Sequence, residues 1–253
     1  PDVLRERLTT QFRMHPSIMK MINYFYDGQL TCGNPDAPRE HQVVLKSKLN
    51  TLVDANKHLL WVDTSNDEKG VSYRDDESSN VTEAKLIAKT LTNINLQMKQ
   101  QGYHSKNKQK VGVVSFYQSQ CRTIRDEIRK ANGGKLDFDA IHVEINTVIR
   151  YQGKEKPIIL ISLVRNDGKP KEYRRSSRAN IARFEFINVA MSRAQNLLMV
   201  FGARNMLELR DVNLPNMDKP GTSKRKIYKD IFNRMDREKQ VSTTREIIQK
   251  KKK

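Results

Sequence analysis

Hydrophobic residues recur along the chain with two spacings, one typical of helices and one typical of strands. A first helix is predicted over residues 15–25, because Pro16 favours a helix start and the apolar positions after it share one helical face. A second is predicted from residue 80, where Asn80 and Glu83 form a start similar to a capping box. Shorter helical patterns follow at residues 121–131, 187–194 and 205–209.

Short apolar runs between the helices predict buried strands at residues 59–63, 111–116, 143–148, 157–164 and 197–201. The run Ile158-Ile159-Leu160-Ile161 is apolar on both faces, as expected of a strand covered by helices above and below. Strands that alternate with helices predict an α/β fold with a mainly parallel sheet. The right-handed crossover rule makes that sheet open and doubly wound, with helices on both faces.

Positive charge dominates the composition and concentrates at one end. The 253 residues include 47 Lys and Arg against 29 Asp and Glu, a formal net charge of +18. Such an excess excludes an acidic or near-neutral enzyme and favours a polyanionic partner. Residues 219–253 hold thirteen basic and four acidic side chains. We therefore expect one globular domain over 1–218, followed by a basic helix and tail over 219–253 that is solvated rather than a dedicated binding arm.

The remaining composition points to a reducing compartment. No apolar run approaches the eighteen residues of a membrane span, and no apolar signal-peptide region is present at the front. Cys32 and Cys121 have no spacing typical of a disulfide framework, so we expect a cytoplasmic or nucleoid-associated protein. Because the chain opens with Pro1 rather than Met, we also expect a fragment of a longer protein.

Phosphate-binding loops and metal sites are missing from the sequence. Gly134-Lys135, Gly153-Lys154 and Gly168-Lys169 are not followed by Ser or Thr, so none completes a Walker-type loop. The five histidines are scattered without the spacing of metal ligands. The chain by itself is therefore expected neither to bind a nucleotide tightly nor to hold a metal.

Three short blocks carry candidate chemistry, and each has an ordinary structural alternative. Residues 11–16 (Q-F-R-M-H-P) place an aromatic and an arginine before a helix, which is also a common helix start. Residues 147–155 (T-V-I-R-Y-Q-G-K-E) combine a tight-turn glycine with ligand-binding polar groups, or form a plain polar connection. Residues 188–194 (N-V-A-M-S-R-A) present an arginine before a buried strand, or form a core helix with a structural ion pair.

Together and in this order, the blocks resemble the second RecA-like lobe of superfamily 1 helicases of the senataxin and nonsense-mediated-decay type. That family has Q-[FY]-R-M-H-P, a glutamine-glycine-x-glutamate block and N-V-A-x-[ST]-R-A in the same order. Residues 25–30, 113–120 and 159–165 are similar to three further family stretches. The resemblance covers residues from about Leu8 to Gly202 and implies a RecA-like fold of the P-loop ATPase class.

The resemblance implies an ATP-dependent motor lobe with 5′-to-3′ polarity. Arg13 and Arg193 would be its catalytic arginine fingers, projected toward ATP and Mg²⁺ held by a first lobe that this chain lacks. Phe12 would stack on the adenine and Glu155 would bind the ribose. The nucleotide-binding residues that it implies are Phe12, Gln152, Gly153 and Glu155. Arginine suits this role because its forked, permanently charged guanidinium grips two phosphate oxygens at once.

Single-stranded DNA or RNA would cross the carboxyl ends of the strands, where open α/β sheets bind ligands. The nucleic-acid-binding residues expected there are Ser115, Tyr117, Gln120 and Thr147, together with Arg174 and Arg175 of the basic stretch 169–178. The alternatives are helix-capping hydroxyls, a partly buried tyrosine and a solvated loop.

Two departures from the family pattern leave a second function open. Ile149 stands where the family usually has aspartate, and Glu185-Phe186 replace a basic pair. In the alternative, the chain is a non-catalytic nucleic-acid-binding module built on a degenerate lobe, and Arg13 and Arg193 are structural.

Overall fold

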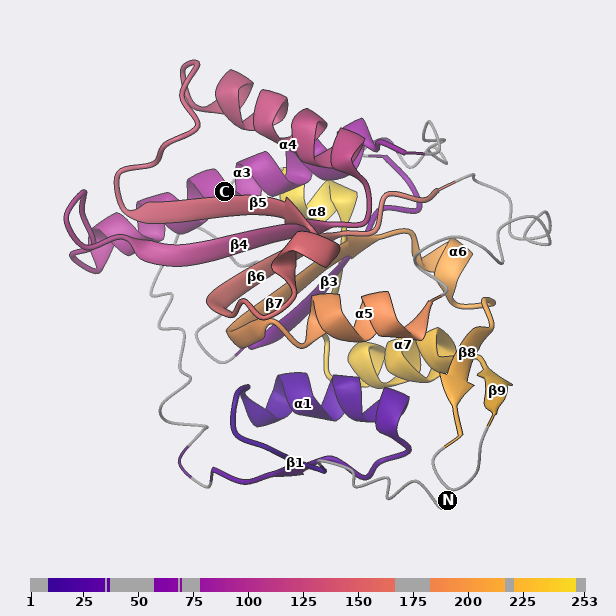
Figure 1. The fold of residues 1–253 in the computed structure, drawn as a ribbon. Helices are drawn as coiled ribbons and strands as arrows, with labels where there is room; N and C mark the ends of the chain where they lie inside the picture. Colours follow the sequence, from indigo (N-terminus) through magenta and orange to yellow (C-terminus); the bar gives the residue numbers. More distant parts are fainter. Residues whose placement is uncertain are drawn as a thin grey trace.

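The central sheet of the computed structural model has six strands, and every hydrogen-bonded pair within it is parallel (Figure 1). Across the sheet the order is β10-β3-β7-β6-β4-β5. The strands are β3 (Leu59–Asp63), β4 (Gln109–Ser115), β5 (Ile141–Thr147), β6 (Lys156–Ser162), β7 (Ala194–Gly202) and β10 (Val241–Thr243). The structure describes residues 9–34, 36, 57–67, 69, 78–166, 183–216 and 221–248. The predicted open parallel α/β architecture is confirmed.

Helices cover both faces of the sheet (Figure 1). One face carries α3 (Val81–Gln100), α4 (Gln118–Ala131) and α8 (Thr244–Ile248). The other carries α1 (Pro16–Ile22), α5 (Phe184–Met191), α6 (Arg204–Leu207) and α7 (Ile227–Arg237). Two 3₁₀ turns, η1 (Asn23–Tyr26) and η2 (Ile149–Tyr151), and two small sheets, β1 (Thr10–Gln11) with β2 (Thr31–Cys32) and β8 (Val212–Pro215) with β9 (Thr222–Arg225), complete the described elements. Within the described ranges, none of the helices combines the length and apolarity needed to cross a bilayer.

Strand β6 shows why an all-apolar run becomes a central strand. Successive side chains of a strand point to opposite faces. Ile159 and Ile161 accordingly join the core under α1, α5 and α7, whereas Ile158 and Leu160 join the core under α3 and α4. All four are essentially inaccessible to solvent. Apolar burial on both faces therefore fixes β6 between β4 and β7.

Helix α3 begins at the predicted residue but with a different capping arrangement. The Asn80 side chain accepts a hydrogen bond from the Glu83 backbone N–H at 2.9 Å, as a cap should. The Glu83 side chain does not return to the Asn80 N–H, which instead donates to Oε1 of Gln120 at 2.7 Å. The Glu83 side chain instead points into the protein interior, where it is fully buried.

The predicted helix over 187–194 ends earlier than expected, and this places one candidate arginine in a turn. Helix α5 stops at Met191, because Ala194 already pairs with Lys156 at the start of β7. Arg193 therefore lies between α5 and β7 rather than on a helical face. The predicted helix over 15–25 likewise divides into α1 and η1.

The boundary expected after residue 218 does not separate a solvated tail. Helix α7 buries Ile227, Tyr228, Ile231, Phe232 and Met235, whose helical spacing makes one continuous apolar stripe. The indole of Trp61 meets the ring of Phe232 edge-on at a centroid distance of 4.7 Å. Strand β10 then adds to the sheet beside β3. Residues 221–248 thus belong to the same fold, and the overall charge of this segment concealed its apolar stripe.

Removing a ring from this stripe tests the corrected boundary. We expect Phe232→Ala to lower the free energy of unfolding by about 3–5 kcal/mol, because it opens a cavity against Trp61. Asn233→Ala, one position along on the exposed face of α7, should change it by less than about 0.5 kcal/mol. Urea denaturation followed by circular dichroism measures both. If both substitutions change the free energy of unfolding equally and only slightly, the prediction of a solvated tail would hold instead.

Candidate functional site

The side chain of Gln11 fixes the turn that carries Phe12 and Arg13. Its Oε1 accepts hydrogen bonds from the backbone N–H groups of Arg13 and Met14, both at 2.9 Å. Its Nε2 donates to the Met14 carbonyl at 3.1 Å. Three hydrogen bonds from one amide thus close the turn between β1 and α1. The backbone from which Phe12 and Arg13 project is therefore held in one conformation.

Arg13 meets Glu155, which lies 142 positions away in the sequence. The Arg13 guanidinium donates to the Glu155 carboxylate, and a second nitrogen lies 3.5 Å from the Ser192 carbonyl oxygen. Both side chains are about one-third exposed, at 37% and 31%. The pair is therefore reachable from solvent, and the predicted residues of the first two sequence blocks come together.

Arg193 completes the cluster from the α5–β7 turn. Its Nε donates to the Val189 carbonyl at 2.9 Å, and its Nη2 donates to Oγ of Ser192 at 3.2 Å. Burial, reinforced by the positive charge of Arg13, lowers the pKa of the Arg193 guanidinium from its ordinary value. An arginine remains charged despite such a shift. Two guanidinium groups therefore share the neighbourhood of one carboxylate, an arrangement that favours an added anion.

Glu155 is held in place through its neighbours. Lys154 and Lys156, on either side of it, both pair with the Glu144 carboxylate on β5. Gly153 adopts φ +81°, a left-handed conformation that lets the chain turn from η2 into β6. Gln195 Nε2 approaches the second oxygen of Glu155 at 3.4 Å. The carboxylate thus stands at the amino ends of β6 and β7.

The other predicted nucleotide contacts are close neighbours of Arg13 and Glu155 along the chain. Gln152 and Gly153 are exposed in the turn before Glu155, and Phe12 is 66% exposed beside Arg13. The described residues contain no group of three or more His, Cys, Asp or Glu able to hold a metal ion.

Ser115 and Gln120 occupy a buried polar network instead of the surface. Gln120 Nε2 donates to the Asn80 carbonyl at 3.0 Å and to Oγ of Ser162 at 2.9 Å. Ser115 Oγ donates to the Ser162 carbonyl at 3.2 Å. Both side chains are fully inaccessible. In this conformation neither side chain can contact a bound polymer, so the expected direct contacts are corrected. Both residues instead form hydrogen bonds in the interior, near the carboxyl ends of β4 and β6.

Tyr117 and Thr147 lie at the carboxyl ends of β4 and β5 and are partly exposed. Arg165 joins them, because its Nε lies 3.2 Å from the Tyr117 hydroxyl and its guanidinium lies 5.7 Å from the ring centroid. Arg174 and Arg175 lie outside the described residues. At the carboxyl edge, Tyr117 and Arg165 therefore lie beside each other, and Thr147 ends the neighbouring strand β5.

The turn that presents Arg165 is strained, and sequence reasoning missed it. Val164 has φ +73°, which is uncommon for a β-branched residue. Its N–H donates to Oε2 of Glu83 at 2.9 Å, and its carbonyl accepts from Asn80 Nδ2 at 2.9 Å. The same Glu83 oxygen accepts from Ser162 Oγ at 2.5 Å, and Oε1 accepts from Thr64 Oγ1 at 3.1 Å. A polar residue on the buried face of α3 was the available signal.

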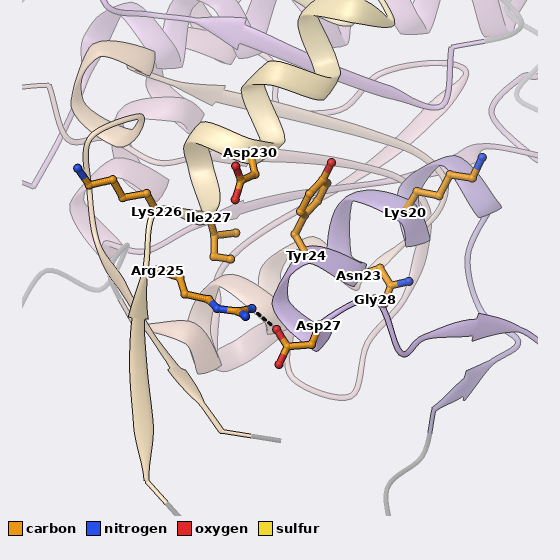
Figure 2. A pocket seen from close by; sticks show the side chains of 9 residues that line it. All are labelled: Lys20, Asn23, Tyr24, Asp27, Gly28, Arg225, Lys226, Ile227 and Asp230. Atoms are coloured by element: carbon orange, nitrogen blue, oxygen red, sulfur yellow. Dashed lines mark hydrogen bonds and ion pairs between the residues drawn. The ribbon is translucent and has the colours of Figure 1, made fainter. Parts of the chain in front are cut away.

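A separate groove of about 650 Å³ opens between η1 and the start of α7 (Figure 2). Asp27 and Arg225 form an ion pair across it, which ties β9 to the end of η1. In Figure 2 the ammonium groups of Lys20 and Lys226 point outward on opposite sides. The lining mixes both charges and contains none of the predicted site residues. The groove therefore marks the packing boundary between residues 20–28 and residues 225–230.

Comparison with known proteins gives one family and several relatives. The AAA domain family model matches residues 3–205. The human DNA replication ATP-dependent helicase/nuclease DNA2 is 29% identical over 216 residues, which cover 78% of this chain and 18% of the relative. Its mouse counterpart is 31% identical over 227 residues, covering 80% and 19%. Helicase SEN1 of Saccharomyces cerevisiae is 28% identical over 207 residues, covering 79% and 8%.

The chain thus spans less than one-fifth of the length of these curated relatives. Among solved structures, T4 UvsW aligns with a TM-score of 0.26 and 13% identity, covering 65% of this chain and 34% of that one. A likeness this low adds nothing to the argument.

The buried carboxylate of Glu83 gives a stability prediction. Glu83→Ala leaves the Val164 N–H and the hydroxyls of Ser162 and Thr64 without their acceptor, so we expect a loss of about 3 kcal/mol in the free energy of unfolding. Lys85→Ala, on the exposed side of the same helix, should stay within about 0.5 kcal/mol. Guanidinium denaturation compares them. A Glu83→Ala variant as stable as Lys85→Ala would contradict the assigned network.

Proposed function

The chain belongs to the AAA domain family of superfamily 1 helicases as their second RecA-like lobe, and we propose from this premise that it supplies arginine fingers to ATP held by a first lobe. The supporting observation is that Arg13 pairs with Glu155, and that Arg193 lies near enough for the charges of both residues to act on its guanidinium, at the amino ends of β6 and β7. Such a lobe is part of an ATP-dependent nucleoside triphosphatase that moves on single-stranded DNA or RNA.

The chemistry of phosphoryl transfer calls for this arrangement. Negative charge spreads over the γ-phosphate oxygens as the bond to the leaving group breaks, and forked cations aimed at those oxygens stabilise it. Arg13 and Arg193 come from separate turns, each fixed by local hydrogen bonds. Because the arginines and the phosphate-binding loop would lie on different lobes, turnover requires the lobes to close.

Glu155 gives the cluster a resting partner. Without nucleotide, its carboxylate neutralises Arg13. When phosphates arrive, their oxygens take over the Arg13 guanidinium, and the released carboxylate becomes available to a ribose hydroxyl. The ion pair between Arg13 and Glu155 is thus replaced by two contacts with the nucleotide. In the absence of nucleotide, the pair keeps both charges partnered.

The remaining nucleotide contacts follow from the same placement. The exposed ring of Phe12 would stack on the adenine, with Gln152 and Gly153 beside the ribose side of the cluster. Mg²⁺ would be held by the first lobe together with the phosphates, since the described part of this chain offers no carboxylate cluster for it.

Nucleic acid would bind at the opposite end of the strands. Tyr117 and Thr147, with Arg165, form the exposed part of the proposed track, and Ser115 and Gln120 support it from inside. Arg174 and Arg175 would extend the track. An aromatic face beside a cation suits a single strand, whose bases stack while its phosphates meet positive charge.

The two free cysteines agree with a cytoplasmic or nucleoid setting.

Substitution of Arg193 separates the motor from the non-catalytic alternative. In a protein that joins this chain to its first lobe, we expect Arg193→Ala to lower kcat for ATP by about 10³-fold or more and to leave single-strand affinity nearly unchanged. Arg193→Lys should restore little, because an ammonium lacks the fork. Arg129→Ala, on the exposed side of α4, is the matched control. Undiminished turnover by Arg193→Ala would contradict the finger role of Arg193. Single-strand binding without ATP turnover in the unsubstituted joined protein would support the binding module instead.

Substitution of Tyr117 tests the nucleic-acid edge. Tyr117→Ala should weaken binding of a labelled single-stranded oligonucleotide by roughly 5- to 100-fold through lost stacking. Tyr117→Phe keeps the ring and loses only the hydrogen bond from Arg165 Nε, so its effect should be smaller. Tyr103→Ala, before β4 at the other end of the sheet, is the control for lost packing. Fluorescence anisotropy gives the three affinities, and equal losses for Tyr117→Ala and Tyr103→Ala would contradict the assignment.

A further inference from the structure

Phe12 is a large aromatic side chain with 66% of its surface exposed, yet its ring rests against the protein. The far edge of the ring lies over the backbone of Gly33, just after β2. A Cβ atom added to Gly33 would lie 2.4 Å from both Cε1 and Cζ of Phe12 and 2.6 Å from Cγ2 of Thr10. Real Cβ atoms do not come this close to carbon, so any side chain at position 33 displaces the ring.

The backbone of Gly33 does not itself require glycine. Its φ lies outside the left-handed region, unlike that of Gly28 or Gly153. Its N–H donates to the Gln11 carbonyl at 2.9 Å, which continues the parallel pairing of β1 with β2. Alanine therefore suits the main chain at this position, and the conflict is with the neighbouring side chains alone. The space left by the missing side chain is occupied by the Phe12 ring and the Thr10 methyl group.

We propose that Gly33 is a positioning residue of the nucleotide site: its bare Cα seats the Phe12 ring so that an exposed aromatic surface is preformed for the purine base. This inference rests on the proposed function and deepens it. Gln11 fixes the backbone on both sides of Phe12, and Gly33 fixes the ring. A ring that is already placed loses less conformational freedom when the base stacks on it.

The location favours a nucleotide base over a base of the nucleic acid. Phe12 is adjacent to Arg13, whose guanidinium meets Glu155 immediately before β6. The nucleic-acid edge follows β6, beyond seven strand residues or roughly 20 Å at about 3.3 Å per residue. A purine stacked on Phe12 therefore lies at the end of the sheet that carries the arginine pair.

The seat is tested first without any ligand. In nuclear magnetic resonance spectra of the 253-residue chain, we expect nuclear Overhauser effects between the Gly33 Hα protons and the Phe12 Hε and Hζ protons. Gly33→Ala should abolish these ring contacts while leaving the unfolding midpoint close to that of Thr31→Ala, a matched substitution on β2. Absence of the contacts in the unsubstituted chain would overturn the proposal.

The second arm is a double-mutant cycle in the protein joined to its first lobe. Phe12→Ala and Gly33→Ala should each raise KM for ATP by roughly 2- to 10-fold with little change in kcat, because stacking is lost in each. The double variant should match Phe12→Ala alone. Additive losses, or a Gly33→Ala enzyme with unchanged KM, would overturn the positioning role. If Phe12→Ala leaves KM unchanged while the Overhauser contacts are present, the proposed adenine stacking falls as well, although the seat itself exists.

Discussion

A sheet covered by helices on both faces can place polar chemistry only at the ends of its strands. The four central residues of β6 show this constraint directly, because each face of the strand is filled by one of two hydrophobic cores. The candidate contacts accordingly lie at the ends of strands or just beyond them. Glu155 and Arg193 precede β6 and β7, whereas Tyr117 and Arg165 follow β4 and β6. The separation of a proposed nucleotide end from a proposed nucleic-acid end is therefore a consequence of burial.

This separation also limits how the two ends can communicate. Strand β6 is hydrogen-bonded to β4 on one side and β7 on the other, so it cannot slide alone. At its carboxyl end, Glu83 and Asn80 hold both polar groups of the strained Val164. A turn held from several sides keeps one conformation, since release would leave buried polar groups without partners. Rigid-body movement of the whole lobe is thus the motion best matched to these contacts.

The sequence predicted what local spacing determines. The apolar run of β6 and the capping residue of α3 were both located correctly, because each is a property of a few consecutive residues. The predicted surface contacts of Ser115 and Gln120 were wrong. The position of a motif cannot show that the Gln120 amide bonds in the protein interior to Ser162 and Asn80, which lie 42 and 40 residues away. The apolar residues of α7 were assigned to a solvated helix and tail, because thirteen basic side chains dominate the segment around them. The role of Gly33 depends on a ring 21 positions earlier, and no periodicity reports such a contact.

The charge of the candidate site differs in kind from the charge of the whole chain. A net charge of +18 draws polyanions toward the molecule at long range, and salt screens it. Arg193 is instead partly withdrawn from water and feels the nearby charge of Arg13, which is why its pKa falls. Glu155 supplies a single negative charge against these two cations. The cluster therefore retains an excess of positive charge in a partly buried position, and a group with two or more negative oxygens relieves this repulsion better than a water molecule or a single chloride.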